Sequence, residues 1–406
     1  MSKHLIDQPA PKGQTALPMF LRVERGLWPH DSTKRLIARL RAPTRSRMAA
    51  FARIARGQRA SRFRRPQNLL KRGQWRISAR GAVSRNAEFC AVVIGRNESA
   101  RLGAALRAVL PLAQRVIYVD SGSRDNSVAL ARAAGAEVLE LDPARPFSAA
   151  RARNEGFAAL GAGRAGFVQF IDGDCIMQPD WPERALRFLA DHPQAGLVFG
   201  RQYEARPDAS VYNFLTDWEW DKPLGEGVFC AGCVMMRAEA LEAVGGYDPT
   251  LIAGEDDDMC IRLQQDGWQT WRIDALMTEH DARLLTFSPW WRRAVRAGHS
   301  YGALGLRHWG RARAQRVRAV LWGGVGPLLA LLGLGFSAWL FVGVMLAYGL
   351  WLARQTWRFH RIGLDPDRAL MVAATLMAGK FAELQGLALF WWRRWRGRGE
   401  TLIEYK

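Results

Sequence analysis

The carboxylates of Asp172 and Asp174 are the residues of this chain best placed for chemistry, because they end an apolar strand pattern and lie two positions apart. Hard oxygen ligands of this kind suit Mg²⁺ or Mn²⁺, which usually also bind phosphate. Side chains on a strand alternate between its faces, but Gly173 lets the backbone turn where the strand ends. We therefore expect both carboxylates to approach one metal-bound phosphate group, as in an enzyme that uses a nucleotide-linked donor.

Polar side chains also end the two apolar runs before this pair. Asn97 and Glu98 follow the first run, and Asp120 ends the second. The expected strands are 90–94, 115–119, 137–141 and 166–171, and the expected helices are 101–110, 127–134 and 149–160. This alternation predicts a mostly parallel sheet with helices on both faces, so functional groups belong at the carboxyl ends of the strands.

Several motifs occur here in a recognisable order. They are residues 91–102 with 119–127, Ser-Ala-Ala-Arg-Ala-Arg-Asn-Glu-Gly at 148–156, and Ile-Asp-Gly-Asp at 171–174. Together they resemble the nucleotide-sugar half of family 2 glycosyltransferases of the GT-A fold. The segments 232–237, 245–248 and 254–263 resemble the acceptor half of that family. The resemblance covers about residues 88 to 300 and implies an α/β, Rossmann-like domain that takes sugars from nucleotide donors.

The resemblance also implies roles for the residues at the strand ends. Asp120 would accept the uracil N–H of a UDP-linked donor, Asp172 would hold the ribose, and Asp174 would bind Mn²⁺ or Mg²⁺ on the two phosphates. A turn cap in the Asp-Ser-Gly-Ser run is the alternative for Asp120. His280 lies where many GT-A enzymes place a histidine metal ligand, and a structural histidine is its alternative. The remaining residues expected to bind the nucleotide-sugar are Asn97, Glu98, Arg151 and Arg153, with a solvated helix face as the alternative for the two arginines.

The acidic run at 255–258 is the candidate for the catalytic base. Attack on the anomeric carbon needs a group that removes the acceptor hydroxyl proton, and neighbouring carboxylates raise the pKa of a carboxylate towards that task. By resemblance the base is Asp256, with Glu255 beside it as acceptor ligand or substitute. For Asp257 and Asp258 we favour the simpler role of acidic residues at a helix N-terminus.

Charge is distributed unevenly along the 406 residues, whose net charge is +20. Residues 1–86 carry +18, residues 87–281 carry −12 and residues 282–406 carry +14. An acidic middle does not suit a nucleic-acid-binding core, whereas basic flanks beside apolar segments suit the anionic face of a membrane. We therefore expect a membrane partner and no nucleic-acid partner.

The five cysteines are too scattered for a disulfide framework, and residues 1–13 contain no apolar run, so the catalytic part is expected in the cytosol. Cys230 and Cys233 have the spacing of a zinc or redox pair. Because no second pair accompanies them, a buried structural role is favoured.

Two apolar stretches near the end of the chain predict a membrane region. Residues 320–353 contain no charge over 34 positions, more than the ~20 needed to cross a bilayer once. Arginines lie on both sides of this stretch, so the positive-inside rule favours a hairpin broken near Gly333 and Gly335. Residues 369–392 carry only Lys380 and Glu383, and would either lie in the membrane plane or form a second hairpin.

These observations predict four regions. They are a basic, partly disordered segment at 1–86, a GT-A domain at 87–285, amphipathic interface helices at 286–318 and a transmembrane or membrane-associated region at 319–406. The predicted function is metal-dependent, inverting sugar transfer to a glycan or lipid-linked acceptor at the cytoplasmic face of the inner membrane. One alternative is a polyprenyl-phosphate sugar synthase. Another, of a different class, is a basic nucleic-acid or membrane-binding protein with an inactive enzyme core.

Overall fold

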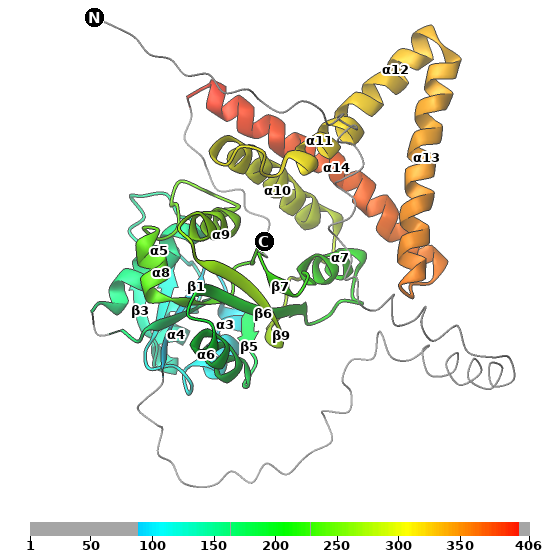
Figure 1. The fold of residues 1–406 in the computed structure, drawn as a ribbon. Helices are drawn as coiled ribbons and strands as arrows, with labels where there is room; N and C mark the ends of the chain where they lie inside the picture. Colours follow the sequence, from blue (N-terminus) through cyan, green and yellow to red (C-terminus); the bar gives the residue numbers. More distant parts are fainter. Residues whose placement is uncertain (1–87, 163, 228, 398–406) are drawn as a thin grey trace, which may run out of the picture. The chain divides into compact units, whose positions relative to one another are not determined.

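The computed structural model describes residues 88–162, 164–227 and 229–397. The prediction of a partly disordered basic segment at 1–86 therefore lies outside the described residues. Within them, an α/β domain precedes a set of long helices (Figure 1).

The α/β domain is organised around a sheet with strand order β3-β2-β1-β4-β8-β6-β9-β5, and β7 pairs with β9. The strands are β1 (Phe89–Gly95), β2 (Val116–Asp120), β3 (Glu137–Glu140), β4 (Phe167–Asp172), β5 (Cys175–Met177), β6 (Ala195–Glu204), β7 (Gly225–Glu226), β8 (Val234–Arg237) and β9 (Gln269–His280). The helices among them are α3 (Ser99–Val109), α4 (Ser127–Ala134), α5 (Ala149–Leu160), α6 (Trp181–Asp191), α7 (Val211–Trp220), α8 (Ala238–Ala243) and α9 (Glu255–Gln265).

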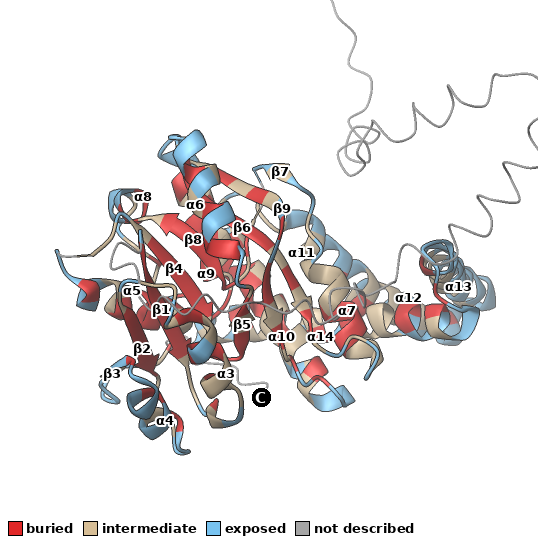
Figure 2. Ribbon diagram, turned by 90° about the horizontal axis from the view of Figure 1, so that it is seen from below, coloured by how far each residue is buried: buried red, intermediate tan, exposed pale blue. Residues whose placement is uncertain are grey.

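The first four strands pair in parallel, as the sequence predicts. The strands β1, β2 and β4 are mostly buried, which is typical of parallel strands covered by helices, whereas the edge strand β3 is half-buried or exposed (Figure 2). In the register of β1, Gly95 lies opposite Asp120, and Ile94 lies opposite Asp172. The carboxyl ends of β2 and β4 are therefore aligned beside the end of β1, where the polar residues follow.

The second half of the sheet is mixed. β8 pairs antiparallel with β4 and β6, whereas β6 pairs parallel with β9. The predicted parallel pairing thus holds among the first four strands and between β6 and β9, whereas the other pairs are antiparallel. The short strand β5 folds back after the turn at 173–174 and pairs antiparallel with β9, with Cys175 opposite His280.

The remaining helices are α10 (Phe287–Arg307), α11 (Arg313–Val320), the π-helical turn η2 (Leu321–Val325), α12 (Gly326–Phe336), α13 (Ala338–Arg361) and α14 (Pro366–Trp395). α14 packs along α10, where glycines let the two backbones meet. A Cβ at Gly298 would collide with the Glu383 carbonyl, and a Cβ at Gly386 would collide with the Val295 carbonyl. Small residues permit this kind of close helix crossing.

The uncharged stretch at 320–353 breaks at Ser337, close to the predicted glycines, and α12 and α13 meet there (Figure 1). Among the described residues, Arg313–Phe336 and Ala338–Arg361 are the two helical segments long and apolar enough to cross a membrane by length and composition. Only 17% of the apolar window of the first segment, and none of the second, is buried, so they are not core helices.

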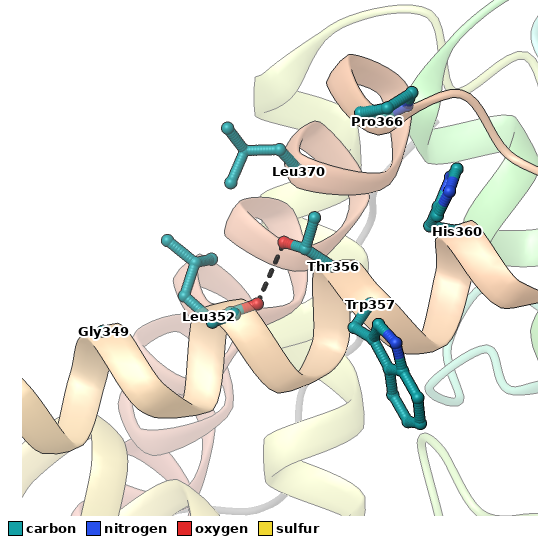
Figure 3. Close-up of a pocket in the computed structure, with 8 residues that line it drawn as sticks. Gly349, Leu352, Thr356, Trp357, His360, Pro366 and Leu370 are labelled. Carbon is teal, nitrogen blue, oxygen red and sulfur yellow. Dashed lines mark hydrogen bonds between the residues drawn. The ribbon is translucent and has the colours of Figure 1, made fainter.

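The second apolar stretch folds differently from one of its predicted arrangements. It forms the single helix α14 and no hairpin, because its small residues pack continuously against α10. Lys380 and Glu383 form the predicted pair on one face, with 2.6 Å between Nζ and Oε1. Where α13 approaches α14, an open apolar groove of about 420 Å³ is lined by residues that include Thr356, Trp357 and His360 (Figure 3). None of its lining residues was predicted to act on the donor or the acceptor.

Candidate active site

Asp120 is buried at the carboxyl end of β2, and its carboxylate accepts two hydrogen bonds from the following turn and one from its own strand. The donors are the Ser123 backbone N–H at 2.7 Å, the Ser123 hydroxyl at 2.5 Å and the Tyr118 hydroxyl at 3.0 Å. The turn-cap role is therefore realised in the structure. A carboxylate oxygen accepts more than one hydrogen bond, so the same geometry leaves donor binding by Asp120 as a proposal.

Asn97 and Glu98 lie in the loop that connects β1 to α3. Asn97 adopts a left-handed backbone conformation (φ 56°), and its side-chain oxygen accepts a hydrogen bond from the Arg124 backbone N–H at 2.8 Å. Glu98 is buried and forms an ion pair with Arg101. These contacts hold the β1 and β2 loops together, so the sequence-predicted residues at both strand ends lie at one edge of the sheet.

The two arginines of α5 have different environments, although they are two residues apart. Ser148 caps the helix by accepting a hydrogen bond from the Arg151 N–H at 3.1 Å. The Arg151 guanidinium is buried and donates to Glu155 and to the carbonyls of the loop before the helix, including that of Arg145 at 2.8 Å. Arg151 therefore fixes this loop and does not lie on a solvated helix face, and its contact with the nucleotide-sugar stays a prediction.

Arg153 joins the two halves of the candidate site. Its guanidinium lies 3.1 Å from Asp172 Oδ1 on the donor side, and 3.0 Å from Glu255 Oε1 and 3.5 Å from Asp256 Oδ1 on the other. It is 2% exposed and stacks over the ring of Tyr247. A buried cation of this kind needs several anionic partners. Arg153 thereby brings together carboxylates that are far apart in the sequence.

The candidate base lies in the first turn of α9. The Gly232 N–H donates to Asp256 Oδ2 at 2.9 Å. Burial raises the pKa of Asp256 to about 7, the charge of Glu255 adds to the rise, and Arg153 opposes it. The sequence predicted this direction from neighbouring carboxylates, whereas burial is the first cause.

Burial acts on Glu255 in the same direction, but Arg153 and then Arg296 outweigh it, so the pKa of Glu255 is lowered. The two adjacent carboxyl groups are thus tuned apart. Asp258 has the structural role that the sequence predicted, because it pairs with Arg262 at 2.7 Å along its own helix and with His308 at 2.7 Å. Asp257 is also in this first turn, and burial raises its pKa.

Asp174 and His280 face each other beneath the turn after β4. Asp174 Oδ2 lies 3.4 Å from His280 Nε2, and ligand atoms of Asp174, Cys175 and His280 lie within 4.8 Å of one another. Among the described residues, His280 Nδ1 has no hydrogen-bond partner, although Glu204 Oε2 lies 3.7 Å from it. A buried carboxylate and imidazole, with a second carboxylate behind the ring, fit a divalent cation.

The structure places further residues beside the predicted site residues. Cys175 joins the metal-ligand set because β5 places it opposite His280, and Gly232 approaches Asp172 so closely that a Cβ would collide with that carboxylate. Trp220, at the end of α7, packs its ring edge against His280 with 4.6 Å between ring centres. The two aspartates have different neighbours, because Asp172 faces Arg153 whereas Asp174 faces His280. Their approach to one metal-bound phosphate group stays a prediction.

All five cysteines are buried and free of disulfides. Cys230 contacts Cys260 at 3.5 Å between sulfurs, so Cys230 and Cys233 have different neighbours. Cys230 and Cys233 therefore do not form a zinc or redox pair with each other, and both are buried, as the sequence predicted.

Comparisons with known proteins bear on this domain. The sequence model described as Glycosyl transferase family 2 matches residues 90–245, and the one described as N-terminal domain of galactosyltransferase matches residues 210–283. A pre-mycofactocin glycosyltransferase from Mycobacterium tuberculosis is 29% identical over 210 residues, which cover 48% of this chain and 43% of that protein. Succinoglycan biosynthesis protein ExoA from Rhizobium meliloti is 28% identical over 281 residues, which cover 63% of this chain and 83% of that protein. The chain thus spans less than half of the mycobacterial relative.

Solved structures include more distant matches. A mannosyltransferase from Pyrobaculum calidifontis, in complex with GDP-Man and Mn²⁺, is 16% identical with a TM-score of 0.49 and covers 75% of this chain and 87% of its own. Glucosyl-3-phosphoglycerate synthase from Mycobacterium tuberculosis, in complex with Mn²⁺ and UDP-glucose, is 21% identical with a TM-score of 0.38 and covers 54% of this chain and 79% of its own.

The mixed sheet, whose parallel strands β2 and β4 end in carboxylates, defines an α/β domain. Residues 90–245 of this chain form a glycosyltransferase family 2 domain. The family and the α/β, GT-A fold class that the sequence motifs predicted are confirmed.

Proposed function

We propose that this protein is a metal-dependent, inverting glycosyltransferase attached to the inner membrane. It transfers a sugar from a UDP-linked donor to a glycan or lipid-linked acceptor at the cytoplasmic face. Asp120 and Asp172 bind the nucleoside, Asp174 and His280 hold Mn²⁺ or Mg²⁺, and Asp256 is the base.

The position of Arg153 is the observation that carries this proposal. Its contacts with Asp172 on one side and with Glu255 and Asp256 on the other put the proposed ribose ligand next to the proposed base. A transferase needs this arrangement, because the acceptor hydroxyl must meet the anomeric carbon of the bound donor. The raised pKa of Asp256, about 7, suits a base that works near neutral pH.

The proposed reaction is a single displacement. Asp256 takes the proton of the acceptor hydroxyl while the hydroxyl oxygen forms a bond to the anomeric carbon. The bond from that carbon to the diphosphate oxygen breaks, and the nucleoside diphosphate leaves with the electron pair, so attack from the opposite face inverts the centre. A divalent cation held by Asp174 and His280 supplies positive charge that stabilises the leaving diphosphate.

The helices after the α/β domain support the membrane part of the proposal. Large apolar side chains such as Leu331, Phe336 and Trp339 are exposed on α12 and α13, with 67%, 87% and 87% of their surface accessible. Arginines precede α12 and end α13. This distribution supports a helical hairpin whose two ends both face the cytoplasm.

A nucleotide-sugar screen tests the activity. The purified protein with Mn²⁺ is expected to be stabilised against heat by UDP and by one UDP-sugar, and to hydrolyse that sugar slowly. A protein that no nucleotide stabilises would contradict the proposed donor site. Product polarity then separates the acceptors, because a polyprenyl-phosphate sugar synthase would put all of the transferred sugar into lipid-extractable material, without a larger glycan.

Reporter fusions test the topology. Fusions after Arg318 and after Arg361 should both report the cytoplasm, because the chain between them would enter and leave the membrane from the same side. A fusion within the loop at Ser337 is the control, and should report the opposite side. A periplasmic signal at Arg361 would show a single crossing and overturn the hairpin.

A further inference from the structure

Cys175 and Cys233 lie together with Asp172 at the wall of the candidate donor site. One sulfur from each cysteine and one carboxylate oxygen of Asp172 lie within 4.8 Å of one another. The two thiols are fully buried, whereas the side chain of Asp172 is 33% exposed. The cluster is therefore enclosed by protein on the cysteine side and open to solvent through the carboxylate.

Three different elements build this cluster. Asp172 ends β4, Cys175 begins β5 after the turn, and Cys233 immediately precedes β8, which pairs with β4. Arg153 holds Oδ1 of Asp172 at 3.1 Å. The other oxygen, Oδ2, faces Gly232, where a Cβ would collide with it. Because Gly232 has no side chain, this carboxylate oxygen, which Arg153 does not hold, lies close to the backbone immediately before Cys233.

Two sets of candidate ligands thus share Cys175 but differ in chemistry. The first, with Asp174 and His280, contains one thiol beside harder donors, whereas the second, with Asp172 and Cys233, contains two thiols. Thiolates select zinc and other soft cations over manganese and magnesium. Zinc with three protein ligands keeps a fourth position for water, so a site of two cysteines and one aspartate is chemically complete.

We infer that Cys175, Cys233 and Asp172 form a zinc site whose occupation inhibits donor binding. Zinc at this site engages Asp172, which the proposed function assigns to the donor ribose, and it also engages Cys175 beside the proposed manganese ligands. Zinc and the nucleotide donor therefore compete. The inhibitory part rests on the proposed function, whereas metal binding by the three side chains does not.

Cobalt spectroscopy tests the site without any nucleotide. Co²⁺ takes the place of zinc and absorbs in the near ultraviolet when thiolates bind it. The full-length protein should develop this absorption, and zinc should remove it. Cys233→Ala should abolish the absorption, whereas His280→Ala and Cys90→Ala should keep it. Absorption that survives Cys233→Ala but is lost with His280→Ala would place the metal in the other ligand set and overturn the inference, as would no absorption in the parent protein.

Alkylation of the parent protein keeps the inference testable if Cys233→Ala does not fold. Zinc should slow the modification of Cys175 and Cys233, mapped by mass spectrometry. The buried thiol of Cys90, which lies at the start of β1 and contacts Gln114 at 3.7 Å, is the internal control and should react equally with and without zinc. Equal protection of all three, or of none, would contradict the site.

Nucleotide titration tests the inhibitory role. With Mn²⁺ present, zinc at about ten times its own Kd should raise the apparent Kd of UDP about tenfold, as competition for one site requires. In Cys233→Ala the same zinc concentration should leave the Kd nearly unchanged. Cobalt absorption with no effect of zinc on UDP affinity would overturn inhibition while the zinc site stands. Absence of any manganese-dependent UDP binding would instead count against the proposed function.

Discussion

The α/β domain buries its large apolar side chains, whereas the helices α12 and α13 expose theirs. Phe170 in the sheet and Leu102 in α3 are fully buried, but Leu331 and Phe336 of α12 are mostly exposed. Arginines differ in the same way. Arg153 is buried among carboxylates, whereas the arginines beside the apolar helices lie before α12 and at the end of α13.

This difference shows what each region is built to contact. In the first region the charged side chains of the candidate site are buried, and interactions between charges are stronger there than in water. In the second region charge is excluded from the apolar surface and kept at its borders, which suits a lipid phase. Substitutions should therefore affect chemistry in the first region and packing or membrane insertion in the second.

The largest effect is expected at Asp256. Asp256→Asn keeps the size of the side chain and removes its basicity, so turnover should fall by roughly 10² to 10⁴, the usual contribution of a positioned general base. The UDP affinity should stay nearly unchanged, because Asp256 is not a proposed ligand of the nucleotide and Arg153, which it contacts, keeps its ion pairs with Asp172 and Glu255. Steady-state kinetics and calorimetric titration of UDP measure the two quantities separately.

Two further variants sharpen that result. Asp266→Asn, at the exposed end of α9, is the matched control and should retain full turnover. Glu255→Gln asks whether the base lies one residue earlier. Activity that survives Asp256→Asn but not Glu255→Gln would move the base to Glu255, and activity that survives both would leave the acidic run as a helix N-terminus.

A smaller effect is expected where α10 and α14 touch. Gly386→Leu should destabilise the helical region by about 1–3 kcal/mol, the usual cost of overpacking, because the new side chain collides with the Val295 carbonyl. Ala388→Leu adds the same side chain at an exposed position of α14 and is the control. Thermal unfolding in detergent measures the difference. UDP binding should survive in both variants, and its loss in Gly386→Leu would show that the two regions are not energetically separate.

The smallest effect concerns stability against pH. The pKa of Asp256 rises from 3.8 in the unfolded chain to about 7 in the folded one, so the folded protein keeps a proton that the unfolded chain loses. Stability should therefore fall as pH rises through this window, with the full loss present above about pH 7. Asp256→Asn removes this titration. The free energy of unfolding of the variant minus that of the parent should therefore be larger at pH 8 than at pH 5, by about 1 kcal/mol or more. A difference in melting temperature that does not change with pH would contradict the assigned shift.

The sequence predicted the strands and helices of the first half of the α/β domain, from β1 to β4, well, because their signals are local. The helices at 127–134 and 149–160 begin and end where predicted, since their boundaries follow from turn residues, a serine cap and glycines. The break near Gly333 was also predictable, because 34 uncharged residues exceed one membrane crossing. Polar residues follow the carboxyl ends of the predicted strands, and these ends meet at one edge of a parallel sheet. The edge that holds the site was therefore predictable too.

The pairing of side chains within the site was not predictable. Arg153 and Glu255 are 102 positions apart, and no local pattern connects an arginine on one helix with an acidic run on another. Cys175 reads as an ordinary apolar strand residue, and only the antiparallel pairing of β5 with β9 brings it to His280. The second hairpin, one of the two arrangements predicted for residues 369–392, was wrong for a related reason. The small residues that let α14 pack against α10 also raise the apolar content of this stretch.

The most direct test of the proposed function is calorimetric titration of UDP into the parent protein and Asp174→Ala, with and without Mn²⁺. Asp180→Ala is the matched control, because its exposed carboxylate lies six residues further on and pairs only with Arg184 at 3.1 Å among the described residues. Loss of a direct metal ligand should weaken manganese-dependent UDP binding at least about 100-fold, since even outer-sphere changes cost 10- to 100-fold. Binding should be lost in Asp174→Ala and kept in Asp180→Ala, with both folds intact. Equal manganese-dependent binding in Asp174→Ala and the parent would contradict the donor site.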